Sequence, residues 1–214
     1  MTAPSKRTLW TGTGLTLAAA AFVSTLVLLE GIPSRGQAAP PPVERIALAT
    51  TPAKPAPPPV DERFVVKRIL PIEGAIRYGE WHWDEKGAPA DGATVITVDL
   101  QANVLSVFRD GHEIGATAIL TGHGEKPTPL GIFPITEKDR DHVSNLYGAP
   151  MPYMLRLTND GISIHGTQVE NGYVTHGCIG VPDSFAAKLF KTARLGDRVI
   201  VTDGAKMKLG DRIV

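Results

Sequence analysis

The sequence predicts a mainly β domain with one main helix, and the observations behind this prediction lie in residues 93–203. Short runs rich in β-branched residues recur there, and each is separated from the next by turn-forming residues. Only residues 183–194 show a good helical pattern, and they follow the single cysteine of the chain. A chain of 214 residues can hold one such domain together with extensions.

The charge composition is balanced. Lys and Arg total 22, and Asp and Glu also total 22. A nucleic-acid-binding domain usually carries an excess of basic residues, so nothing in the composition suggests a nucleic acid as partner. The balance says nothing for or against small or wall-like substrates.

The N-terminal region, residues 1–32, has the features of an export signal or of a single membrane anchor. Lys6 and Arg7 precede an uncharged run at 8–29, which is long enough to span a bilayer as a helix. Cleavage near the small residues at 36–38 would release the domain, whereas an uncleaved run would anchor it. The length of the run favours the anchor. Either alternative places the domain outside the cytoplasm, in the periplasm or cell wall.

Two further segments precede the domain. Residues 33–60 are rich in Pro and Ala and predict an extended spacer. Residues 61–92 form an extension with a possible short strand at 63–70 and an aromatic strip from Tyr78 to Trp83. Such a strip either grips a ligand or packs the extension onto the domain, and we favour packing.

The elements of the domain follow in order. A meander of three strands leads to a loop and a fourth strand, and residues 139–152 are polar enough to predict a surface loop. Two strands then lead to the cysteine. The helix follows, capped by Asp183 or Ser184, and a last strand closes the sheet before a C-terminal tail at 204–214. The predicted strands are 94–100, 104–108, 113–120, 132–136, 153–157, 162–165 and 199–201.

The chemistry of the chain is predicted to lie between residues 164 and 182. Cys178 has no cysteine partner for a disulfide, and His165 and His176 are near it in sequence. A free thiol is usually a buried apolar filler, but a thiol in a glycine-bounded turn beside an imidazole suits a nucleophile. If His165 ends a strand, the returning loop brings Cys178 to it. The turn would direct the backbone N–H groups of Gly177 and Cys178 toward one oxyanion.

The motif His165-Gly166 followed by Thr175-His176-Gly177-Cys178 resembles the L,D-transpeptidases of bacterial cell walls. Residues 127–133 and Met151-Pro152-Tyr153 also resemble that family, and the likeness covers about 94–202. The resemblance implies a β-sandwich or barrel-like domain with one main helix after the catalytic cysteine.

The resemblance also implies roles for individual residues. Cys178 would form a thioester with the diaminopimelate carbonyl of a peptidoglycan stem peptide and release D-alanine, and an amine would then take the acyl group. His165 would be the base, oriented by the carbonyl of Gly166, and His176 and Gly177 would support the site. Tyr153, Met151 and Thr175 would lie along the substrate groove. No metal or organic cofactor is implied, and we expect a monomer.

Two departures from the family concern the substrate. Gly180 stands where the family usually has Arg or Asn, and the loop from His165 to Thr175 is shorter than usual. Both leave open whether transfer or hydrolysis dominates.

Three alternatives use other features of the sequence. An L,D-carboxypeptidase would use the same dyad with water, and a non-catalytic wall-binding module would grip glycan with Trp81 and Trp83. A metal site made from the histidines near Cys178 matches no common ligand spacing; its members would be His123, His165, His176 and Cys178. His82, His112 and His142 are assigned to the surface or to packing.

Overall fold

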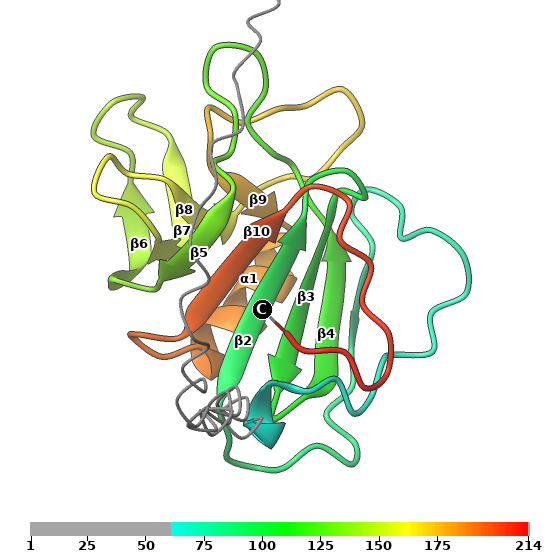
Figure 1. Ribbon diagram of the computed structural model, residues 1–214. Coiled ribbons are helices and arrows are strands. Elements are labelled where there is room, and N and C mark those ends of the chain that lie inside the picture. Colours follow the sequence, from blue (N-terminus) through cyan, green and yellow to red (C-terminus); the bar gives the residue numbers. More distant parts are fainter. Residues whose placement is uncertain (1–60, 214) are drawn as a thin grey trace, which may run out of the picture. The chain divides into compact units, whose positions relative to one another are not determined.

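The computed structural model describes residues 61–213, and Figure 1 shows their arrangement. The predicted export signal or anchor and the proline-rich spacer therefore lie outside the described residues. Within residues 61–213, no helix is long and apolar enough to cross a membrane.

A six-stranded sheet forms one layer of the domain. Strands β2, β3 and β4 are an antiparallel meander, and β10 returns to pair with β2 in parallel. The turn between β3 and β4 is tight because Asp110 and Gly111 both have positive φ, 45° and 80°, as two-residue hairpin turns require. The spatial order is β1 (Trp81–Trp83), β4 (His112–Ala118), β3 (Val104–Arg109), β2 (Thr94–Asp99), β10 (Arg198–Thr202) and β5 (Gly131–Pro134).

A four-stranded sheet forms the second layer. Its strands run antiparallel from β6 to β8, and β9 joins β8 in parallel. A parallel pair needs a long connection, and here residues 167–178 form it. The order is β6 (Glu137–Val143), β7 (Pro150–Arg156), β8 (Ser163–Gly166) and β9 (Ile179–Val181).

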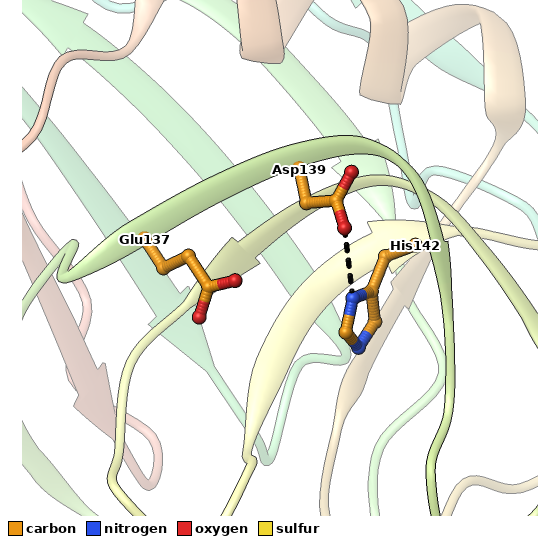
Figure 2. Close-up of side chains that lie close together, drawn as sticks. All are labelled: Glu137, Asp139 and His142. Atoms are coloured by element: carbon orange, nitrogen blue, oxygen red, sulfur yellow. Dashed lines mark hydrogen bonds and ion pairs between the residues drawn. The ribbon is translucent and has the colours of Figure 1, made fainter.

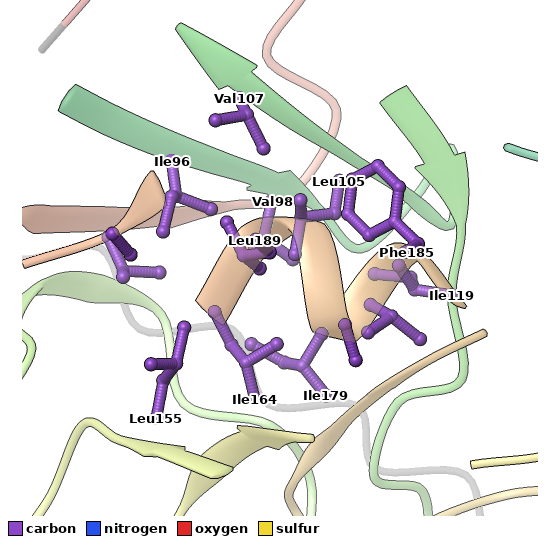
Figure 3. Close-up of a cluster of buried hydrophobic side chains, with 14 of the residues drawn as sticks. Ile96, Val98, Leu105, Val107, Ile119, Leu155, Ile164, Ile179, Phe185 and Leu189 are labelled. Carbon is purple, nitrogen blue, oxygen red and sulfur yellow. The ribbon is translucent and has the colours of Figure 1, made fainter. Parts of the chain in front are cut away.

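Helix α1 (Asp183–Thr192) lies between the two sheets, and Figure 3 shows Phe185 and Leu189 of this helix inside the shared core. Phe185 is fully buried and also meets the rings of Trp81 and Trp83, 6.3 and 5.4 Å away between centroids. Burying each large apolar side chain contributes about 1.5–3 kcal/mol, so α1 fixes the separation of the sheets. The mainly β fold with one helix after the cysteine is confirmed.

The aromatic strip of the N-terminal extension belongs partly to this core. Trp81 and Trp83 lie on β1, an edge strand paired with β4. Their rings pack on Phe185, and the indole N–H of Trp83 donates to Glu85 over 2.8 Å. Tyr78 remains exposed.

The prediction of a surface loop at 139–152 holds for residues 144–149, which form a largely exposed turn along the cavity, and is wrong for 139–143 and 150–152, which are strand. These residues make most of the β6–β7 hairpin, in which Glu137 pairs with Arg156 and His142 pairs with Met151. The strand β6 is polar because one of its faces is open to solvent, and its pairing partner is what makes it a strand. Strand β9 was also missed, because three residues are too few for a recognisable pattern.

Two smaller predictions also need correction. Residues 63–70 form a short 3₁₀ turn (Glu62–Phe64) and isolated bridges, since their pairing partners are the distant Arg212 and His112. Helix α1 begins after Pro182 with no side-chain cap and ends at Thr192. Residues near the C-terminus are packed on the domain, with Ile213 only 1% exposed.

Candidate active site

Cys178 stands directly before β9, and the core fixes the direction of its side chain. Ile164 of β8 and Ile179 of β9 are register partners and both face the core. Side chains alternate along strands, so His165 and Cys178 face the opposite side of the sheet. The structure thereby brings the predicted nucleophile and the predicted base to one face, on neighbouring strands.

The turn before Cys178 needs a glycine at position 177. Gly177 has a φ of 101°, and a Cβ there would lie 2.5 Å from Cδ1 of Ile162. The hydroxyl of Thr175 donates to the carbonyl of Cys178 over 2.5 Å and closes the turn. Within the described chain, the N–H groups of Gly177 and Cys178 donate to no protein acceptor. N–H groups without a protein acceptor can donate to an oxyanion, although Gly177 is buried and does not itself line the cavity.

The imidazole of His165 is held in one orientation. Its side chain is 9% exposed, and Nδ1 lies 2.9 Å from the carbonyl oxygen of Gly166. A carbonyl only accepts, so Nδ1 carries the proton and Nε2 has a free lone pair. This tautomer can take a proton from a thiol.

Burial sets the protonation of both groups. Burial lowers the pKa of His165, although the Gly166 carbonyl and the charge of Asp183 partly oppose this shift. Burial raises the pKa of the Cys178 thiol, partly opposed by the N–H of Ser163 and the charge of Arg156. The resting pair is therefore a neutral thiol and a neutral imidazole, and the proton moves when the sulfur attacks.

Both groups open into a cavity of about 800 Å³, a volume typical of small-ligand sites. The β6–β7 hairpin forms one wall, and residues 125–129 and 159–162 form others. Thr175, His176 and Met151 line it together with Cys178 and His165. Five of the eight predicted site residues thus line a single concave surface, whereas Gly166, Gly177 and Tyr153 do not line it.

A model of the L,D-transpeptidase catalytic domain matches residues 93–201, just over half of the chain. The chain belongs to the L,D-transpeptidase family.

Named relatives agree with this. L,D-transpeptidase 1 of Mycobacterium tuberculosis is 27% identical over 156 residues, which cover 65% of this chain and 62% of that protein. The putative L,D-transpeptidase YqjB of Bacillus subtilis is 28% identical over 137 residues, 56% of this chain and 78% of its own length. The chain spans less than two thirds of the mycobacterial relative.

Among solved structures, an L,D-transpeptidase from Stackebrandtia nassauensis is 27% identical to this chain. The match covers 57% of this chain and 62% of that one, with a TM-score of 0.49.

Of the residues that the L,D-transpeptidase resemblance places along the groove, Tyr153 lies elsewhere. It does not line the cavity, and its ring meets Phe190 edge-on at 5.9 Å. Its φ is 58°, which is rare for a bulky residue. Tyr153 therefore packs against the core and not along the cavity.

His176 is exposed at the mouth of the cavity of this L,D-transpeptidase domain. Its ring stacks on Tyr147 from the β6–β7 hairpin, with centroids 4.7 Å apart. The ammonium of Lys126 donates to the Tyr147 hydroxyl over 3.0 Å. These contacts join the hairpin, the 125–129 loop and the cysteine loop. Lys126 and Tyr147 were missed from the sequence because their contact spans 21 residues.

Gly180, where the family usually has Arg or Asn, has little room for a side chain. It pairs with His165, and a Cβ there would lie 2.7 Å from Cγ2 of Thr167 and 3.4 Å from Cβ of Leu120. Thr167 itself lines the cavity. A larger residue at position 180 therefore requires Thr167 to move.

His142 was assigned to the surface or to packing, yet it lines the cavity. Figure 2 shows it beside Asp139 and Glu137 of the same strand. One ring nitrogen of His142 and one carboxylate oxygen from each acidic residue lie within 4.8 Å of one another. Asp139 is already bonded to His142 and Glu137 to Arg156, at 3.0 and 2.5 Å. No local pattern in the sequence indicates that His142 faces the cavity, because this depends on how β6 and β7 pair.

Proposed function

We propose that this chain is a peptidoglycan L,D-transpeptidase that works through a thioester on Cys178. The observation that carries the proposal is that Cys178 and His165 line one cavity from neighbouring segments of the second sheet. The thiol itself lies 3.9 Å from the carbonyl oxygen of Gly161. Membership of the L,D-transpeptidase family supplies the substrate class. We further propose that the domain acts outside the cytoplasm, where its substrate lies.

The acylation step follows from the tautomer of His165. The Cys178 sulfur attacks the carbonyl carbon of diaminopimelate in a stem tetrapeptide while its proton passes to Nε2 of His165. The N–H groups of Gly177 and Cys178 stabilise the oxyanion of the tetrahedral intermediate. The C–N bond to D-alanine then breaks, the proton of His165 moves to the departing amine, and a thioester remains.

The second step completes the transfer. An amine, such as the side-chain amine of another stem peptide, attacks the thioester carbonyl and forms an amide. The C–S bond breaks, and Cys178 recovers its proton. Water in place of the amine gives the carboxypeptidase reaction, so the two activities differ only in the acceptor.

The test uses purified protein and two kinds of acyl donor. A carbapenem, whose β-lactam ring opens on attack, is expected to add its full mass to Cys178, and a stem tetrapeptide is expected to release D-alanine. Product analysis with and without an amine acceptor then separates transfer from hydrolysis. If neither donor yields a covalent adduct or product, the nucleophile assignment fails and the wall-binding alternative gains support.

A further inference from the structure

The cavity is lined by three histidines, and the proposed acylation step uses only His165. His142 lies on β6 and faces the same cavity as Cys178 and His165. Its charge is close enough to contribute to lowering the pKa of His165. The two imidazoles therefore lie on different strands around one bound substrate.

The orientation of His142 is fixed by a carboxylate. Nδ1 of His142 lies 3.0 Å from Oδ2 of Asp139, as Figure 2 shows, and the His142 side chain is 15% exposed. The carboxylate only accepts, so Nδ1 carries the proton and Nε2 has a free lone pair. Within residues 61–213, the hydrogen bond recorded for this ring is the one at Nδ1. The carboxylate thereby fixes the tautomer and the direction of the ring.

A break in the strand alternation turns His142 toward the cavity. Asp139 and His142 are three residues apart, and an unbroken strand would place them on opposite faces. The ladder between β6 and β7 omits the pair of Arg140 and Tyr153, where Tyr153 has its φ of 58°. This irregularity reverses the faces beyond it, so that His142 and its partner Met151 both line the cavity.

The charged groups around His142 in the described part of the chain either contact its Nδ1 or pair with one another. On its own strand, Asp139 holds Nδ1, while Glu137 is paired with Arg156 of β7. From β8, the facing titratable group is His165, whose pKa burial lowers. His142 and His176 are thus the two further histidines that line the cavity. His176 is exposed and stacked on Tyr147, whereas the ring of His142 is held by the carboxylate of Asp139.

The chemistry of transfer requires two proton acceptors. The acceptor amine arrives as an ammonium at neutral pH and must lose one proton before it can attack. It loses a second proton when the amide forms, and that proton restores the thiol of Cys178 through His165. Water needs only one proton removed before the thioester breaks, so hydrolysis needs one base.

We propose that His142, held by Asp139, is the base that removes the first proton from the acceptor ammonium. The inference rests on the thioester mechanism proposed above. The proton passes from the ammonium nitrogen to Nε2 of His142 and then to solvent. The neutral amine attacks the thioester. Its second proton passes to His165 and from there to the sulfur as the C–S bond breaks.

The experiment compares the wild-type chain with His142→Asn, which keeps a donor to Asp139 and removes the base at Nε2. Thioester formation, hydrolysis and transfer to a diaminopimelate-type amine are measured separately, alongside the melting temperature. Thioester formation and hydrolysis are expected to stay within about twofold of wild type. Transfer is expected to fall by about 100-fold, within the range of a positioned general base.

Hydroxylamine provides the decisive control, because it is already neutral at the assay pH and needs no base for its first proton. His142→Asn is expected to transfer acyl groups to hydroxylamine at nearly the wild-type rate. Asp141→Asn, an exposed change on the same strand, is the matched variant and is expected to leave all rates unchanged.

The outcomes separate this inference from the function on which it rests. Equal loss with both acceptors, or undiminished transfer to the diaminopimelate-type amine, overturns the role of His142 and leaves the thioester mechanism standing. A wild-type chain that forms no thioester overturns both.

Discussion

The imidazole of His165 donates its Nδ1 hydrogen to the carbonyl oxygen of Gly166, 2.9 Å away. The acceptor belongs to the next residue of the chain and to the same strand, β8. The orientation of the base therefore depends on the backbone and not on a third side chain. This arrangement keeps Nε2 unprotonated while burial keeps the ring neutral.

Replacement of Cys178 tests the nucleophile directly. Cys178→Ala is expected to abolish acylation by a carbapenem and by a stem peptide, because no other thiol exists in the chain. The side chain is only partly buried, so the free energy of unfolding should change by about 1 kcal/mol or less. Mass spectrometry and thermal unfolding check the two parts. Any residual turnover in a folded variant contradicts the assignment.

The pH dependence of acylation tests the neutral pair. Burial lowers the pKa of His165, so the neutral base persists to lower pH than a free imidazole with its ordinary value of 6.5. The acidic limb of kcat/KM should therefore lie below pH 6.5. The rate should fall only as the pH drops through the lowered pKa of His165. An acidic limb at or above the ordinary value would contradict the role of burial.

The pH dependence of alkylation tests the protonation of the Cys178 thiol. Burial raises the pKa of Cys178, so the free enzyme contains little thiolate at neutral pH. Alkylation by iodoacetamide should be slow at pH 7 and should increase only at a higher pH than for an ordinary thiol. Rapid alkylation at neutral pH would indicate a preformed thiolate and imidazolium instead.

A double-mutant cycle tests the contact between Gly180 and Thr167. Gly180→Ala places a Cβ 2.7 Å from Cγ2 of Thr167 and is expected to destabilise the fold by about 1–3 kcal/mol. Thr167→Ser removes that methyl group, so the double variant should recover most of the loss. Urea unfolding measures the four free energies. Additive effects would mean that the two positions are not coupled.

Tyr153 is expected to matter through its ring and its backbone. Tyr153→Ala loses the contact with Phe190 and leaves the strained φ unsupported, which should cost about 2–3 kcal/mol of stability and lower acyl transfer. Tyr153→Phe keeps the ring and is the control, expected to match wild type. Equal behaviour of the two variants in both assays would remove Tyr153 from any positioning role.

Much of the fold is present as local pattern. Strands of the first sheet carry β-branched runs, and helix α1 has a buried apolar stripe. The Asp110-Gly111 pair predicts a tight turn because both residues accept positive φ. Elements without such patterns were misread. Strand β6 is polar and is a strand because β7 pairs with it, and the residues at 63–70 find their partners near residues 112 and 212.

The sequence by itself determined the family, the mainly β fold and the residues proposed as nucleophile and base, since a specific motif of Thr, His, Gly and Cys lies within a few consecutive positions. Only the tertiary structure decided that Tyr153 leaves the groove and that His142 enters it. The reason is that one residue with positive φ reverses which side chains of a strand face the cavity, and no local pattern in the sequence records that reversal.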